Sequence, residues 1–373
     1  MRGVWLKMTD RGIYKFGIRE LALCSMGVFL LALMIRNSDV AITYVHEGLS
    51  VCARALIPSL FPFMVISDLF IKSGGADLLG RLLGAPMRAL FGVSGAGAVA
   101  VVIGALCGFP IGARCAVSLL DSGRISHDEC ERLIAISSNP SSAFLISAVG
   151  VSLFGSRAFG RALYAATLAS SAVVGIVLGV ISRRKKPALK ALRGISPDTP
   201  KKHRFCAGDV SDAIASSAEA MLKVCAFVVF FTAFTGVLCE MLSACALPQS
   251  IKAAICAFFE LTGGVAEAAK VKPAATGGII AALAAGWSGV SVSLQISGIC
   301  RGREISLLPY VISKLATGAL AALMISVYLR IAPPTFYADT PTVLIEPRGA
   351  WITCAVFAAA CLFYIIKRRE RNE

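Results

Sequence analysis

The stretch AVAVVIGALCGFPIGARCAVSLL, residues 98–120, decides the fold class of this 373-residue chain. It is apolar enough for a membrane helix, yet Gly108, Pro110, Gly112 and Arg114 interrupt its centre. Such residues are tolerated at membrane depth only where the freed backbone groups face protein or a water-filled cavity. A second apolar segment is interrupted at 286–291. Two broken segments in corresponding halves of a chain indicate a substrate site near the membrane midplane.

The composition is that of an all-α, polytopic integral membrane protein. Hydrophobic residues make up 57% of the chain and charged residues only 16%, with a mean hydropathy of +0.76. A span needs about 20 mostly apolar residues, so we expect about eight transmembrane helices together with broken or re-entrant ones. The clear candidate spans are 17–35, 55–71, 161–181, 221–242, 307–329 and 351–366. The shorter or broken candidates are 93–120, 133–154, 251–269 and 274–299.

The net charge of +15 comes from basic residues that flank apolar segments. They concentrate in the amino-terminal tail, in the connection 182–206 and in the carboxyl-terminal tail. This is the positive-inside pattern of a membrane protein, so the expected partner is a lipid bilayer. Without an aromatic-interleaved basic motif we expect no nucleic acid partner.

The thirteen cysteines are scattered, with no Cys-x-x-Cys pair, and the chain has only three histidines. Metal sites and disulfide scaffolds need tighter clustering. We therefore expect no metal and no cofactor, and we interpret the cysteines as small apolar residues that let helices approach.

A weak repeat divides the chain at its basic linker. The expected organisation is an amino-terminal tail and first helix at 1–54, a first repeat at 55–181 and a basic linker at 182–210. A second repeat core follows at 211–330, and an extramembrane loop, last helix and basic tail at 331–373. The segment 78–91 is expected to match 251–269, the broken segment 93–120 to match 274–299, and 133–154 to match 307–329. A cytoplasmic amino end and a cytoplasmic linker make the repeat inverted, and the side of the carboxyl end stays open.

Another interruption lies at residues 137–144, in the sequence SSNPSSAF. Pro140 lacks an amide hydrogen and biases Asn139 away from helical geometry, so one half-helix should end here and another begin. Ser141 or Ser142 would then cap the new amino terminus, whose N–H groups attract an anion. The alternative is a kink packed by small residues, which membrane helices tolerate.

Several of these stretches resemble the YlbJ family of sporulation integral membrane proteins, which carries the nucleoside-recognition, or Gate, type of domain. The stretches are LIPSLFPFMVISDLFI at 56–71, GALCGFPIGARC at 104–115, ISSNPSSAFLISAVG at 136–150 and FELTGG at 259–264. The resemblance implies a multi-pass protein of endospore-forming bacteria. It further implies movement of dipicolinate, a small aromatic dianion, across the outer forespore membrane, and it relates the chain to nucleoside and ferrous-iron transporter cores.

The charged residues inside apolar segments are the candidate ligands for an anion. A charge at the bilayer centre costs about 2.5–3.5 kcal/mol even on insertion scales, so such residues tend to be functional. Arg114 and Lys314, with half-helix amino termini, would hold two carboxylates. The alternative is that both side chains reach the interface or pair with acids such as Asp68 and Glu260.

Glu260 and its neighbour Thr262 form the other candidate group. At membrane depth Glu260 would suit proton coupling, whereas a segment ending at the following double glycine would leave it at the interface. Ser288, Ser291 and Gln295 of the second broken segment would donate hydrogen bonds across the cavity, although membrane serines also pack against backbone.

Two classes of function remain open. The first is a transporter or channel component for a small anion, or for a nucleoside or ion of the wider Gate group. The second is a non-transporting membrane scaffold for spore-envelope assembly, with a second copy or other sporulation membrane proteins as partners. We do not expect an enzyme, because no Ser-His-Asp, Cys-His or paired-carboxylate arrangement can be assembled.

Overall fold

The computed structural model describes residues 18–185, 207–245 and 247–332, and throughout these ranges the chain is helical with no strand. This confirms the all-α membrane class. The expected last span at 351–366, most of the basic linker and both tails lie outside the described residues. The proposed domain boundaries stay predictions.

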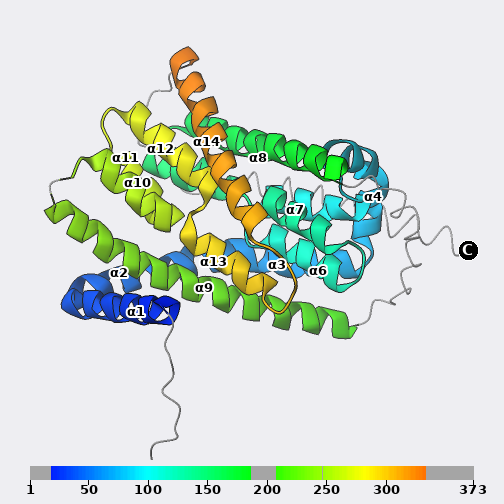
Figure 1. Cartoon of the computed structure of the whole chain (residues 1–373), viewed down its shortest axis with the longest axis horizontal. Coiled ribbons are helices and arrows are strands. Elements are labelled where there is room, and N and C mark those ends of the chain that lie inside the picture. The colour runs from blue at the N-terminus through cyan, green and yellow to red at the C-terminus, as the bar shows by residue number, and fades with distance from the viewer. Residues whose placement is uncertain (1–17, 186–206, 246, 333–373) are drawn as a thin grey trace, which may run out of the picture.

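The first two described helices meet at a sharp bend. Helices α1 (Ile18–Arg36) and α2 (Ser38–Val51) meet at 93°, and α2 runs along the long helix α9 (Ala207–Ala244). Figure 1 shows α1 and α2 in blue beside α9, which crosses the molecule. The chain then continues through η1 (Cys52–Leu56), α3 (Ile57–Lys72), α4 (Gly75–Pro86), η2 (Met87–Phe91) and η3 (Gly95–Gly97).

The opening stretch of sequence folds into a hairpin, which we call hairpin 1. It consists of α5 (Ala98–Cys107) and α6 (Ile111–Asp121), and its tip is residues 108–110. The two helices pack on each other so closely that a Cβ added to Gly112 would lie 2.8 Å from the Cα of Gly104. These two glycines stand four residues on either side of Gly108, which is the pairing expected when a chain folds back on itself.

A second hairpin, hairpin 2, has the same construction in the other half of the chain. It consists of α10 (Gln249–Phe259) and α11 (Leu261–Ala269), with Glu260 at its tip. A Cβ on Gly264 would lie 2.2 Å from the Cα of Ala257, so these two helices are also packed side by side. Small residues at such contacts let helix backbones approach, which is how helices associate in lipid.

Each hairpin is followed by a broken helix pair and then a long helix. In the first half these are α7 (His127–Ser137) with the π-type helix η4 (Ala143–Leu153), and then α8 (Arg157–Lys185). In the second half they are α12 (Ala274–Trp287) with α13 (Gly289–Cys300), and then α14 (Leu308–Ile331). In neither pair do the two pieces pack side by side within the described residues. We call the pairs broken span 1 and broken span 2, and the second is among the helices that are long and apolar enough to cross a membrane.

This order corrects the predicted register of the repeat. The break at 108–110 is a hairpin tip and matches Glu260, whereas the break at Asn139 matches the one at Ser288. Likewise α14 matches α8, whereas the sequence interpretation had paired the segment of α14 with residues 133–154. Hydropathy gave the wrong pairing because a hairpin and a broken span have the same apolar pattern and differ only in which helices pack together.

The two halves interlock. Helix α13 of broken span 2 packs against α6 of hairpin 1, and η4 of broken span 1 packs against α11 of hairpin 2. As a result, both large clusters of buried apolar side chains draw residues from both halves, and Phe109 at the tip of hairpin 1 packs against both clusters. In Figure 1, α13 and α14 run between the α10–α12 group and the α4–α7 group.

Four described helices or broken spans are long and apolar enough to cross a membrane, or six if each bent pair counts as one span. They are 157–184, 208–244, 274–300 and 308–331, and the bent pairs are 24–51 and 75–107. The predicted spans at 161–181 and 221–242 fall within these helices, and the one at 307–329 coincides with 308–331 except for its first residue. The sequence count of about eight is higher partly because it included both hairpins.

Candidate functional site

Hairpin 1 meets broken span 1 through backbone contacts. The Phe109 N–H donates to the carbonyl oxygen of Asn139 over 2.8 Å. Gly108 adopts φ +81°, which non-glycine residues rarely tolerate, and a Cβ there would lie 2.6 Å from the Ser141 nitrogen. A Cβ on Gly112 would lie 2.4 Å from the Ser137 oxygen. The predicted residues Gly108, Pro110 and Gly112 therefore form a tip that fits closely against the predicted break at 139–142.

Asn139 organises the interior of that break. Its side chain is 2% exposed, and its Nδ2 donates to the Ile136 oxygen over 2.7 Å and to Ser171 Oγ over 3.2 Å. Ser171, on α8, in turn donates to the same Ile136 oxygen over 2.9 Å. The carbonyl groups freed where α7 ends are thus partly satisfied by side chains, as a break at membrane depth requires.

Lys314, on α14, reaches this break from the other half of the chain. It is fully buried, and its Nζ donates to the Ser138 oxygen over 2.5 Å and to Asn139 Oδ1 over 3.1 Å. It forms no ion pair within the described residues. Lys314 therefore neither reaches an interface nor pairs with Asp68 or Glu260, which were the alternatives that the sequence left open.

The far side of the same break begins a new helix, as predicted. Pro140 is buried and Ser141 and Ser142 are half-buried. The Phe144 N–H donates to Ser141 Oγ over 3.3 Å, so Ser141 caps the start of η4. Ser142 makes no side-chain capping bond. The interruption is thus a true helix break and not a kink.

Glu260 is the capping residue of hairpin 2. Its Oε1 accepts from the Thr262 N–H over 2.8 Å and its Oε2 from the Gly263 N–H over 2.6 Å. The residue is 6% exposed, so it is not an interface residue. The carboxylate fills the position at the start of α11 that would otherwise attract an anion.

Broken span 2 packs against this tip. A Cβ on Gly289 would lie 3.2 Å from the Glu260 Cα, and Trp287 Nε1 donates to the Phe258 oxygen over 2.9 Å. Ser288, at the break, is fully buried with φ +68°, and its hydroxyl donates to the Ala285 oxygen over 3.2 Å. Each hairpin tip therefore lies against the broken span of its own half.

Ser291 and Gln295 lie further along α13. Gln295 Nε2 donates to Ser291 Oγ over 3.5 Å, and both residues are buried. Gln295 Oε1 has no hydrogen-bond partner among the described residues. These two predicted residues contact each other, and neither forms a hydrogen bond with Lys314.

Helix α14 connects the two breaks. A Cβ on Gly286 would lie 2.4 Å from the Gly318 Cα, and one on Gly318 would lie 3.1 Å from the Trp287 nitrogen. Lys314 stands one turn before Gly318 on the same helix.

Helices α5 and α10, of 10 and 11 residues, rise about 15 Å at 1.5 Å per residue. That is half of a hydrocarbon core of about 30 Å, so neither helix alone is long enough to cross it.

Arg114 makes no side-chain contact with the residues of this junction. It lies one turn beyond the tip on α6, is half-buried, and makes no side-chain hydrogen bond or ion pair with a described residue. Asp68, its expected alternative partner, lies 3.3 Å from Lys72 Nζ on its own helix.

Charged side chains outside the spans fasten the ends of the helices. Arg303, in the loop after α13, contacts both carboxylate oxygens of Asp121 over 2.6 Å, which ties that loop to the end of α6. At the base of hairpin 2, Glu267 lies 2.6 Å from Lys270 Nζ and accepts from Gln249 over 2.8 Å. Burial favours the protonated carboxyl, but the hydrogen bonds from Lys270 and Gln249 outweigh it and lower the pKa of Glu267.

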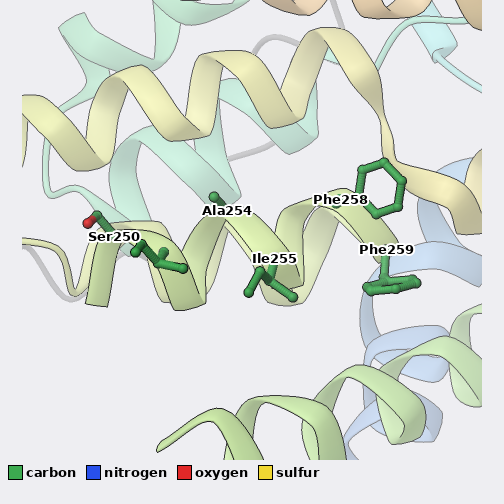
Figure 2. Close-up of a pocket in the computed structure, with 6 residues that line it drawn as sticks. Ser250, Ala254, Ile255, Phe258 and Phe259 are labelled. Atoms are coloured by element: carbon green, nitrogen blue, oxygen red, sulfur yellow. The ribbon is translucent and has the colours of Figure 1, made fainter. Parts of the chain in front are cut away.

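An open groove of about 510 Å³ follows the outer face of α10. Figure 2 shows Ile255 and Phe259 on one face of α10, and Phe258 beside the connection between α12 and α13, where its ring stacks on Trp287 with centroids 5.7 Å apart. The lining is almost entirely apolar and lacks a charged residue. It is therefore not the site for an anion.

Sequence reasoning missed several residues of the junction. Ser171, Ser137 and Ser138 escaped notice because serines are common in membrane helices and carry no specific signal alone. The spacing of Thr167, Ser170 and Ser171 along one face of α8 was the available clue. The cysteine interpretation was wrong at one place, since Cys239 and Cys256 are joined by a disulfide.

No group of three His, Cys, Asp or Glu side chains is placed to hold a metal ion in the part of the chain that the structure describes. The expectations of no metal and no cofactor stay predictions.

Two hairpins have tips that meet two broken spans, and a buried lysine of α14 contacts one of these spans. With its long apolar helices, this arrangement defines a multi-pass membrane protein that has a buried polar junction. The chain is 28% identical over 335 aligned residues to the sporulation integral membrane protein YlbJ of Bacillus subtilis (strain 168). The alignment covers 83% of this chain and 82% of that protein. This similarity extends over most of both chains and supports the resemblance to the YlbJ family of sporulation membrane proteins. No protein-family model and no solved structure matches it.

Proposed function

We propose that this protein moves a small organic anion, with dipicolinate as the specific candidate, across the outer forespore membrane during sporulation. One observation carries the proposal. Lys314 is fully buried where hairpin 1 meets broken span 1, and its ammonium contacts only neutral oxygens of described residues. A buried charge without a counter-charge is costly at membrane depth, and it is retained where a ligand of opposite charge arrives.

The two breaks differ in a way that supports an anion at Lys314. At the tip of hairpin 2, which lies against broken span 2, the carboxylate of Glu260 already occupies the start of α11, so that junction carries a negative group. At broken span 1 the charged group is an ammonium. Arg114, one turn beyond the tip of hairpin 1, makes no contact with this junction and stays a sequence-based candidate for a second carboxylate.

Uptake of labelled dipicolinate into proteoliposomes tests this function. The variant K314Q removes the charge and should lower the initial rate at least tenfold at equal protein abundance. The matched control is K223Q, because Lys223 is also on a membrane helix but its side chain is 69% exposed and pairs with Glu219 on the surface. Equal rates in K314Q and K223Q would contradict a role for the buried ammonium.

The same vesicles separate the remaining alternatives. Uptake of a labelled nucleoside in place of dipicolinate would overturn the anion proposal in favour of the wider Gate group. If wild-type vesicles take up neither compound, and spores lacking the protein still accumulate dipicolinate, the proposal fails in favour of a scaffold.

A further inference from the structure

The ammonium of Lys314 donates to two oxygen atoms at the break. Ser138 offers its carbonyl oxygen at 2.5 Å and Asn139 its Oδ1 at 3.1 Å. The hydroxyls of Ser137 and Ser138 are buried in the same break and have no hydrogen-bond partner among the described residues. Both serines are at most 1% exposed. The break therefore presents neutral oxygens to a cation, and it holds no carboxylate partner for Lys314.

These oxygens belong to the carboxyl end of a half-helix. α7 ends at Ser137, and Ser138 leaves helical geometry with φ −91° and ψ 69°. The end of a helix carries partial negative charge on its unpaired carbonyl groups. In transporters with broken helices, unwound carbonyls and half-helix carboxyl ends are the groups that coordinate a coupling cation. Here the group at that position is the side chain of Lys314, which arrives from α14.

We propose that the Lys314 ammonium takes the place of a coupling cation at the carboxyl end of α7. The protein then carries its own monovalent cation at this break, fixed to α14, and needs no sodium or potassium ion there. Shortening the side chain to alanine removes the ammonium and leaves its oxygen ligands facing a vacancy. That vacancy is a binding site for a free monovalent cation.

This inference rests on the proposed function, because a cation can be a coupling cation only in a protein that transports a substrate. A fixed ammonium supplies the positive charge that an anionic ligand needs, so uptake should be the same in sodium, potassium or N-methylglucamine chloride. The ion position itself can be tested without any transport substrate.

Thermal unfolding of the purified full-length protein tests the ion position. The midpoint is measured against sodium, potassium and N-methylglucamine chloride at constant ionic strength. Wild type should show the same midpoint in all three salts. K314A should show a saturable rise of a few degrees with sodium or potassium, because a ligand that binds only the folded state stabilises it by mass action. K314M fills the space without charge and should show no rise.

Binding of labelled sodium to the same three proteins gives a second readout. Saturable binding is expected for K314A alone. A folded K314A without any cation response, or a K314M with the same response as K314A, would overturn the proposal. If K314A does not fold, the wild-type protein still tests the proposal. A wild-type unfolding midpoint that depends on sodium or potassium overturns the proposal, and a midpoint that is the same in all three salts supports it. Because none of these readouts uses dipicolinate, failure here is distinguishable from failure of the proposed function.

Discussion

Removing the carboxylate of Glu260 should loosen the tip of hairpin 2. Its two oxygens accept hydrogen bonds of 2.8 and 2.6 Å from the first free N–H groups of α11. A hydrogen bond to a charged group contributes about 1.5–3 kcal/mol, and burying a carboxylate costs several kcal/mol. Removal of an N-cap side chain costs about 0.5–2 kcal/mol net. Because E260A loses two hydrogen bonds, it should lower the stability of this tip by an amount near the upper end of that range, about 2 kcal/mol.

Hydrogen exchange measures this change where it occurs. Since about 1.4 kcal/mol is a factor of ten, amide exchange in a peptide covering 261–269 should become about 30-fold faster in E260A. E260Q keeps one acceptor and should fall between E260A and wild type. The control is E304A, because Glu304 is exposed in the loop before α14. Unchanged exchange at 261–269 in E260A would refute the capping role, whatever happens to activity.

Two further outcomes follow from contacts elsewhere in the fold. G112A should lower stability by about 1–3 kcal/mol through overpacking, since its Cβ would lie 2.4 Å from the Ser137 oxygen; G298A, with no atom within 4 Å, is the control in thermal unfolding. At the base of hairpin 2, the lowered pKa of Glu267 means that its contact with Lys270 stabilises the fold above the unfolded-state pKa of about 4.3. This contribution is lost as the pH falls through the lower folded pKa. E267Q should therefore unfold at a lower temperature at pH 7 and lose less stability than wild type on acidification to pH 3, and parallel pH profiles of the two proteins would contradict this.

Local interruptions were predictable from sequence because glycine and proline act on their own stretch of backbone. The breaks at Gly108, Asn139 and Ser288 were all predicted, and Ser141 caps a helix as expected. The break at Glu260 was not recognised, since no proline marks it. Its signal was an acid placed two and three residues before the amides of Thr262 and Gly263, the spacing of a helix cap.

Packing between distant segments was not predictable. Lys314 was a candidate for a buried charge, with a position at the interface as the alternative, and its partners Ser138 and Asn139 lie about 175 residues away in the chain. The same limit explains the error in the repeat register. Whether two apolar helices fold back or continue is decided by contacts such as Gly104 against Gly112, which a hydropathy pattern does not contain.

A site halfway through the hydrocarbon core divides the membrane potential into two nearly equal parts. Moving one elementary charge across the whole potential changes its energy by about 2.3 kcal/mol per 100 mV. A dianion that travels from one surface to a site at half depth carries two charges through half of that field, which is also about 2.3 kcal/mol per 100 mV. The second half of the journey contributes the same amount again. A neutral nucleoside in the same position feels none of this field.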